Sequence, residues 1–335
     1  MTSDGQGKNK TRDRILNILK IVISLGVLAV IVSRIDLEEV GRVLVGIDWL
    51  AFGVAYALFM IGSLVRAYRW GVLVWALGVQ VSGWRLVCLH YVGVFFSQFL
   101  PTGVGGDAVR MYELSQDDQK AASAISSVLV DRFLGLFILY TLALVALLGG
   151  SQLVEPGVQA LIALVFAGSL IASALVLQRT WIERWGQRLG LDRLLGRVKI
   201  LRELYASLHL YGPAALLRAT VASVAWNLIL IVGYYLLGLS VGIDLALWYY
   251  FLLVPIISAM LLLPSVGGLG VREGATVFLF TQAGVAPARA GALAAIYLLT
   301  VWTNALIGAV IYIVQGLRGA RRAAHKEEKT RLEGP

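Results

Sequence analysis

Long apolar stretches separated by short polar segments dominate this sequence. A helix that crosses a bilayer needs about 20 mostly apolar residues, because each residue advances the helix by about 1.5 Å. Six stretches meet this requirement, namely residues 15–33, 49–69, 121–149, 158–178, 213–240 and 289–316. The pattern therefore predicts an all-α, polytopic membrane protein. The composition excludes a soluble domain, since 59% of the residues are hydrophobic, 15% are charged and the mean hydropathy is +0.79.

Two shorter apolar stretches, residues 86–100 and 246–263, each stop at a break rich in proline and glycine. The first break lies in FLPTGVGGDAVRMYEL (99–114) and the second in LPSVGGLGVRE (263–273). Both breaks contain a proline, paired glycines and a trailing Val-Arg in the same order, and their prolines are 163 residues apart. We interpret each stretch as a half-helix that ends at its break. The break residues are Pro101, Gly103, Gly105 and Gly106 in the first copy and Pro264, Gly267 and Gly268 in the second.

Basic residues collect in three segments, the N-terminal tail 1–14, the segment 179–211 and the C-terminal tail 317–335. By the positive-inside rule, all three are cytoplasmic. We therefore expect a multi-pass protein of the plasma (inner) membrane with both termini in the cytoplasm. Arg66 and Arg69 end the second predicted span, and we expect their side chains to reach the cytoplasmic interface.

The segment 179–211 has leucines and aromatic residues spaced three and four apart, with arginines and acids between them. This spacing predicts an amphipathic helical linker on the cytoplasmic surface. The alternative is an ordinary linker whose arginines only hold the topology.

The predicted orientation determines how the two broken segments run. The number of membrane crossings must agree with the cytoplasmic position of the three basic segments. The segment near 86–115 must therefore enter the membrane from the cytoplasm and return to it, and the segment near 246–285 must enter from outside and return there. The two halves, 15–149 and 158–316, then form an inverted-topology repeat with two re-entrant helical hairpins that enter from opposite faces. The alternative is that similar small-residue loops occur in both halves by coincidence.

Each break directs a helix N-terminus, with its free N–H groups and partial positive charge, into the protein. Asp107 stands where an N-cap residue belongs, and Arg110 and Arg272 follow the two breaks with a full positive charge each. Two such tips favour a phosphate-bearing substrate. Glycine-rich turns also serve close helix packing, but packing does not account for an arginine after both breaks. The loose dinucleotide spacing in GVGGDA is not preceded by a strand and does not indicate a nucleotide site.

Three further charged residues, Asp131, Arg132 and Glu273, fall within the predicted membrane segments. A charged side chain near the centre of a membrane helix costs about 2.5–3.5 kcal/mol if it is unpaired, so these groups must be paired or hydrated. We expect the three acids, Asp107 included, to pair with the arginines or to meet a headgroup amine, and Arg132 to complete the network. The alternative is a purely structural role, in which Asp131 and Arg132 clamp the first hairpin.

The sequence gives no support for a cofactor or for enzymatic chemistry. Cys88 is the single cysteine and there are three histidines, too few for a disulfide framework, a cysteine-rich zinc site or a histidine cluster. No arrangement of nucleophile and base is readable. The net charge of +9 is explained by basic residues that border the spans, so we expect no binding of nucleic acid.

Four motifs in this order resemble one known family. RAYRW (66–70), FFSQFLPTGVGGDAVRMYEL (95–114), LVDRFLGL (129–136) and LLPSVGGLGVREG (262–274) are similar to the flippase-like transmembrane region of lysylphosphatidylglycerol synthases, over residues 10–316. The resemblance implies a lipid flippase. Full-length members also carry a soluble aminoacyltransferase domain, whereas here only a short basic tail follows residue 316. We therefore expect a free-standing member without synthase activity, and its substrate need not be the lysyl lipid.

The sequence and this resemblance thus predict a flippase that moves an anionic or zwitterionic phospholipid similar to aminoacyl-phosphatidylglycerol, or a polyprenyl-phosphate-linked lipid, between leaflets. The predicted substrate-binding residues are Asp107, Arg110, Asp131, Arg132, Arg272 and Glu273. The alternative is a non-transporting membrane subunit that presents lipid to a synthase or glycosyltransferase. The expected partners are membrane lipids, such an enzyme under the alternative, and a second copy of the chain if the protein is a homo-oligomer.

Overall fold

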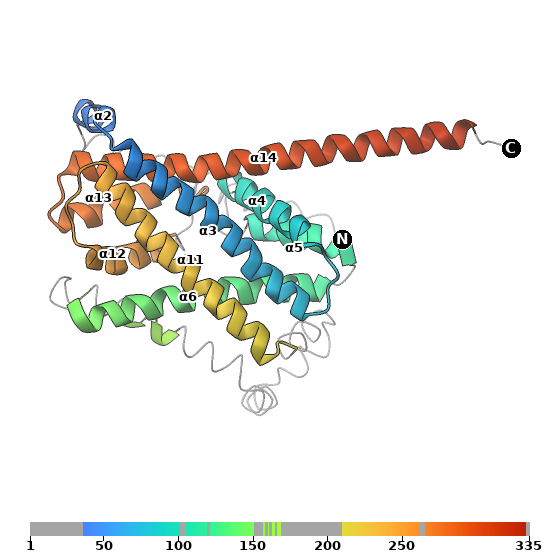
Figure 1. Cartoon of the computed structure of the whole chain (residues 1–335), viewed down its shortest axis with the longest axis horizontal. Coiled ribbons are helices and arrows are strands. Elements are labelled where there is room, and N and C mark those ends of the chain that lie inside the picture. The colour runs from blue at the N-terminus through green and yellow to red at the C-terminus, as the bar shows by residue number, and fades with distance from the viewer. Residues whose placement is uncertain are drawn as a thin grey trace, which may run out of the picture.

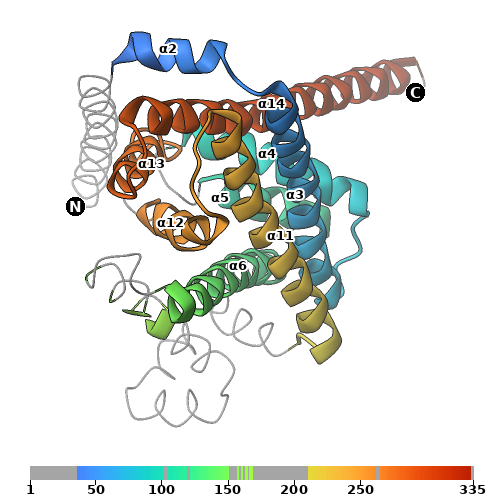
Figure 2. The ribbon, with the colours of Figure 1, turned by 60° about the vertical axis from the view of Figure 1, so that its left-hand side comes forward.

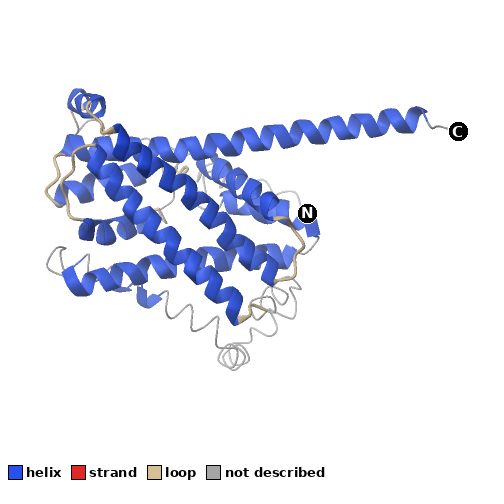
Figure 3. Ribbon diagram, viewed as in Figure 1, coloured by secondary structure: helices blue, strands red, loops and turns tan. Residues whose placement is uncertain are grey.

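The computed structural model describes residues 36–100, 105–118, 121–150, 210–261 and 265–332, with single positions between 157 and 168. These residues form helices and loops, and no strand occurs among them (Figure 3). The helices are α2 (Leu37–Val45), α3 (Trp49–Ala76), α4 (Gly83–Phe99), α5 (Gly105–Asp118), α6 (Ala121–Gly150), α11 (Pro213–Ser240), α12 (Leu247–Met260), α13 (Val271–Gln282) and α14 (Pro287–Leu332). The all-α prediction is confirmed for this part of the chain.

Several predicted features lie outside the described residues. They are the tail 1–14, the span 15–33, most of the span 158–178, residues 179–209 of the linker, and the break residues Pro101, Gly103 and Pro264.

Within the described residues, α3, α6, α11 and α14 are long and apolar enough to cross a membrane. They coincide with four of the six predicted spans. Local chemistry explains where two of them begin: the Asp48 carboxylate accepts the N–H groups of Leu50 and Ala51 at the start of α3, and Pro213 is the first residue of α11. Two helices continue beyond the predicted spans. The helix α3 continues to Ala76, and α14 continues to Leu332, so that its C-terminal part extends well beyond the other helices (Figure 1).

The helix order repeats along the chain. The helices α3, α4, α5 and α6 begin at residues 49, 83, 105 and 121, and α11 to α14 begin at 213, 247, 271 and 287, so partners start 164 to 166 residues apart. The first helices of the two sets lie side by side and antiparallel (Figures 1 and 2). At one end of this pair, the Asp48 N–H donates to the Ser240 carbonyl at 2.9 Å. This arrangement is the one that an inverted repeat requires. The membrane face from which each hairpin enters stays a prediction.

Glycines allow α3 and α11 to approach closely. A Cβ atom on Gly62 would lie 2.5 Å from the ring of Trp226, and one on Gly233 would lie 2.7 Å from the ring of Phe59. Each helix thus supplies a glycine that receives an aromatic ring of the other. Small residues at such crossings are typical of membrane helices, where van der Waals packing replaces the hydrophobic drive of water.

The two broken segments meet inside the bundle. The helices α4 and α5 form an antiparallel hairpin, in which Gly106 packs directly against Gly93 and Ser97. In the second copy, Gly267 and Gly268 adopt left-handed φ angles of 60° and 78°, which favour glycine. A Cβ atom on Gly267 would lie 2.7 Å from the backbone oxygen of Gln98, at the end of α4. The second break therefore contacts the backbone just before the first.

Candidate functional site

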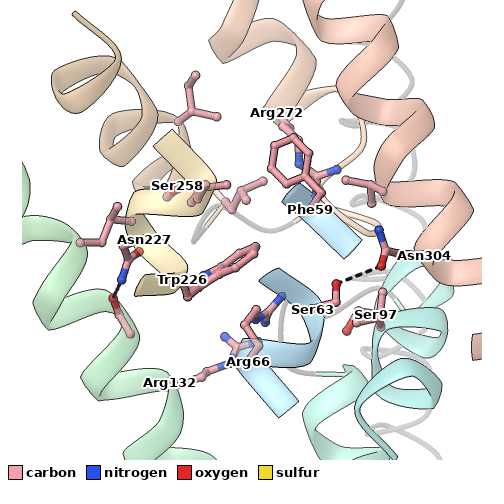
Figure 4. A pocket seen from close by; sticks show the side chains of 18 of the residues that line it. Phe59, Ser63, Arg66, Ser97, Arg132, Trp226, Asn227, Ser258, Arg272 and Asn304 are labelled. Atoms are coloured by element: carbon pink, nitrogen blue, oxygen red, sulfur yellow. Dashed lines mark hydrogen bonds between the residues drawn. The ribbon is translucent and has the colours of Figure 1, made fainter. Parts of the chain in front are cut away.

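A cavity of about 370 Å³ lies where the two breaks meet, between the two repeats (Figure 4). Its lining comes from α3 to α6 and from α11 to α14, and each of these eight described helices contributes at least one residue. On the side of the second break, Ser265, Gly267 and Gly268 line it. Because irregular backbone at membrane depth persists only against protein or a water-filled cavity, such a cavity satisfies the condition that the breaks impose.

The cavity lining is strongly basic. Among the described residues, its charged members are five arginines and two aspartates, Arg66, Arg69, Arg110, Arg132, Arg272, Asp107 and Asp131. Five of the six predicted site residues are therefore brought together, and Glu273 is not among the lining residues. The arginines Arg66 and Arg69 were not predicted as site residues.

Five of these charges form an alternating chain of four ion pairs, with Arg69 at one end and Arg132 at the other. The Arg69 Nε donates to Asp131 Oδ1 at 2.6 Å, and the Arg110 Nη1 lies 3.7 Å from Asp131 Oδ2. The Asp107 carboxylate in turn binds both Arg110 and Arg132. This network, made of Arg69, Asp131, Arg110, Asp107 and Arg132, ties α3, α5 and α6 together. All its members except Arg132 are buried.

Asp107 is the third residue of α5 rather than its N-cap, so the prediction of a capping role was wrong. The helix begins at Gly105, because the two glycines form its first turn in close contact with α4. The Asp107 side chain is instead engaged by Arg110 and Arg132. Asp131 and Arg132, both on α6, contact Arg110 and Asp107 on α5. These contacts join the first hairpin to a span, as the alternative of a structural clamp requires.

The prediction that Arg69 reaches the cytoplasmic interface was wrong. Arg69 is 3% exposed, because α3 does not end at this residue but continues to Ala76. Space for its guanidinium comes from Gly135 on α6, where a Cβ atom would lie 2.7 Å from Nη1. The side chain also donates to Ser223 Oγ at 3.3 Å. An arginine at the end of an apolar run looks like an interface anchor, and only packing reveals its burial.

The same prediction was wrong for Arg66, one turn earlier on α3. Its guanidinium carbon lies 5.1 Å from the centroid of the Trp226 ring on α11 and lines the cavity. Among the described residues, no carboxylate lies within ion-pair distance of Arg66. Cation–π contact with tryptophan is favourable, but it does not neutralise the charge.

Arg272 is the charged residue that the second break supplies to the cavity. It is 8% exposed, its Nη2 donates to the Gly267 carbonyl at 3.1 Å, and its guanidinium lies 5.7 Å from the Tyr297 ring. Its Nη1 is buried and makes no hydrogen bond. A buried guanidinium nitrogen without an acceptor is costly, which makes it a candidate for binding a ligand.

Arg110 and Arg272 do not occupy equivalent positions in their helices, although both follow a break in the sequence. Arg110 is the sixth residue of α5, whereas Arg272 is the second residue of α13. The residues that correspond are the acids, since Asp107 and Glu273 are each the third residue of their helix. The two repeats therefore carry their positive charge to the cavity in different ways.

The expected pairing of Glu273 with the arginines is not observed. One oxygen of its buried carboxylate accepts the N–H of Gly270 at 2.7 Å, and the other has no hydrogen-bond partner. Glu273 therefore caps the start of α13, as a carboxylate does at the third position of a capping box.

Uncharged polar groups complete the lining. Ser63 Oγ donates to the Asn304 amide oxygen at 2.9 Å and so joins α3 to α14. Asn227 Nδ2 donates to the Gly135 carbonyl at 3.2 Å and joins α11 to α6. Both contacts are drawn in Figure 4. In the described part of the chain, no group of three or more His, Cys, Asp or Glu side chains is placed to hold a metal ion.

Comparison of the sequence with known families shows which family the chain belongs to. A family model described as "Lysylphosphatidylglycerol synthase TM region" matches residues 17–308, which is most of the chain. The chain belongs to this family. No significant match is found among curated proteins or among solved structures. The match confirms the resemblance inferred from the four motifs, and with the long apolar helices it establishes a multi-pass membrane protein.

Proposed function

We propose that this protein is a lipid flippase of the plasma membrane. The headgroup of a phospholipid or a polyprenyl-phosphate-linked lipid enters the cavity between the repeats, while its apolar chains stay in the bilayer. One observation carries the proposal: the cavity where the two breaks meet is lined by five arginines against two aspartates. The family match supports a role connected with lipid, and transport itself is the proposed step.

The energetic reason for such a cavity is the cost of moving a charged headgroup through hydrocarbon. Guanidinium groups and helix N-termini replace the water that a phosphate group loses on entering the membrane. In inverted repeats, substrate sites lie between the two halves, and rocking of one half against the other exposes the site to each side in turn. The cavity described here occupies that position. Its lining residues come from both sets of helices, α3 to α6 and α11 to α14.

The proposal is tested by reconstituting the full chain into liposomes with fluorescent lipids. The candidates are phosphatidylglycerol, its lysyl ester and a polyprenyl-phosphate sugar. A flippase is expected to expose inner-leaflet label to an impermeant quencher faster than protein-free vesicles do. The Arg110→Ala, Arg272→Ala double variant is expected to lose this activity. Arg289→Ala, which removes an exposed arginine bound to the Gly242 carbonyl at 2.6 Å, is the matched control.

Two outcomes would contradict the proposal. Transport by the double variant at the wild-type rate would remove the cavity from the mechanism. Absence of transport for all three lipids would favour the non-transporting alternative, a subunit that presents lipid to a synthase or glycosyltransferase.

A further inference from the structure

The charges that line the cavity do not balance. The ion-pair network contains three arginines and two aspartates and so carries one excess positive charge. Arg66 and Arg272 add two more, which gives an excess of three among the described lining residues. The undescribed residues at the two breaks, 101–104 and 262–264, contain no ionisable side chain. Counting Glu273, which does not line the cavity, still leaves an excess of two.

The excess charge is concentrated on two residues. Arg69, Arg110 and Arg132 each contact a carboxylate of the network, whereas Arg66 and Arg272 contact aromatic rings. Arg272 carries the stronger signal, because it is more than nine-tenths buried and its Nη1 has no acceptor. It is also the second residue of α13, so the N-terminus of a 12-residue helix adds its partial positive charge at the same place.

We infer that the cavity selects a headgroup with a net charge near −2, a phosphate monoester or a diphosphate, whose oxygens are bound by Arg272 while Arg66 adds positive charge to the same cavity. This inference rests on the proposed function in taking the anion to be part of a lipid. The planar guanidinium fork of Arg272 matches the geometry of phosphate oxygens, and its Nη1 is a buried donor without an acceptor.

The excess positive charge of the lining residues also excludes a headgroup with net positive charge. An aminoacylated phosphatidylglycerol would place an ammonium group in a cavity that already holds excess positive charge. The two acids that could receive it, Asp107 and Asp131, are each bound by two arginines. A cationic headgroup would therefore have to displace an arginine from a buried ion pair.

The inference is tested by binding to the purified full chain in detergent, which does not require transport. The probes are dioctanoyl phosphatidic acid, dioctanoyl phosphatidylglycerol, its lysyl ester, and inorganic phosphate. The readout is the ligand-dependent shift in thermal unfolding at fixed ionic strength and pH 8, where a phosphate monoester is close to doubly ionised. We expect phosphatidic acid to bind about tenfold or more tightly than phosphatidylglycerol, and the lysyl ester to bind most weakly, since one charge-assisted hydrogen bond to a phosphate oxygen is worth about that factor.

Tight binding of the lysyl ester, or equal binding of all three lipids, would overturn the inference. Inorganic phosphate that binds as tightly as phosphatidic acid would overturn its lipid part, because the ligand would then be free phosphate. The order of affinities in the wild-type chain is itself a test and does not depend on the folding of any variant.

Variants then locate the site. Arg272→Gln is expected to reduce the preference for phosphatidic acid over phosphatidylglycerol about tenfold. Arg66→Gln is expected to reduce it by less, because it removes only one positive charge from the cavity. The control Arg289→Gln, which replaces an exposed arginine on α14, is expected to leave it unchanged. An unchanged preference in monodisperse Arg272→Gln protein would overturn the assignment. Charge-ranked binding without transport would support this inference and refute the flippase, and transport without charge ranking would do the reverse.

Discussion

Removing the Asp131 carboxylate tests whether the ion-pair network holds the first hairpin in place. Asp131 accepts from Arg69 at 2.6 Å and lies 3.7 Å from Arg110, and all three side chains are at most 5% exposed. In Asp131→Ala, the Arg69 guanidinium loses its only carboxylate partner among the described residues, and Arg110 keeps only Asp107. The variant therefore leaves a positive charge buried without compensation.

The expected magnitude follows from this burial. Breaking a buried pair by removing one partner costs about 3–5 kcal/mol, because the remaining charge stays desolvated. For chains of 150–250 residues, each kcal/mol lowers the melting temperature by about 2–4 °C. Taking the lower slope for the larger chain of 335 residues, we expect a decrease of about 6–10 °C.

The assay is thermal unfolding of the detergent-solubilised chain, followed by the loss of monodisperse protein. The matched control is Glu113→Ala, which breaks the partly exposed pair of Arg85 and Glu113 at 3.0 Å, with side chains 29% and 31% exposed. Exposed pairs contribute about 1 kcal/mol or less, so the control is expected to change the melting temperature by about 2 °C at most.

A double-mutant cycle separates the pair from its surroundings. The cycle consists of Asp131→Ala, Arg69→Met and the double variant with both changes. Because the double variant has lost both charges of the pair, it is expected to be more stable than Asp131→Ala. A decrease below about 2 °C in Asp131→Ala, or a double variant as unstable as the two single changes added together, would refute a structural role for this pair.

Three further predictions concern the fold. Gly106→Val places a side chain in direct contact with the α4 backbone and is expected to abolish the expression of monodisperse protein. The control Gly53→Val, with nothing within 4 Å of the added Cβ, is expected to express normally. Equal yields of monodisperse protein from the two variants would contradict the packing of the hairpin. The double variant Asp48→Cys, Ser240→Cys, in a background without the native cysteine, is expected to form a disulfide on mild oxidation. The reason is that the backbone N of residue 48 lies 2.9 Å from the backbone O of residue 240. Absence of the cross-link would argue against the antiparallel packing of α3 and α11. A cysteine at residue 190 is expected to resist an impermeant thiol reagent applied from outside, and its labelling there would reverse the predicted topology.

The sequence alone was sufficient to predict the long helices. The four described spans were found by counting apolar residues, because a membrane helix satisfies its backbone hydrogen bonds internally and only its apolar length matters. The repeat was found from the sequence of the two breaks, since a proline, paired glycines and an arginine follow one another in the same order in both. The order of helices in both halves agrees with that prediction.

The sequence did not show which charges are paired and which are not. Arg66 and Arg69 are three residues apart on one helix and looked alike, yet Arg69 is neutralised by a carboxylate 62 residues further along the chain and Arg66 faces the ring of Trp226. Likewise, Arg110 and Arg272 follow similar breaks, but one lies between two aspartates and the other has a guanidinium nitrogen without an acceptor.

There is a physical reason why the sequence predicted the helices but not the pairing of the charges. Helix formation, helix ends and helix breaks depend on residues within a few positions of one another, so they can be read along the chain. The state of a buried charge depends on the few ångströms around it, and those are set by how helices distant in sequence pack. In this protein, for example, Gly135 on α6 leaves the space that the Arg69 guanidinium occupies beside Asp131.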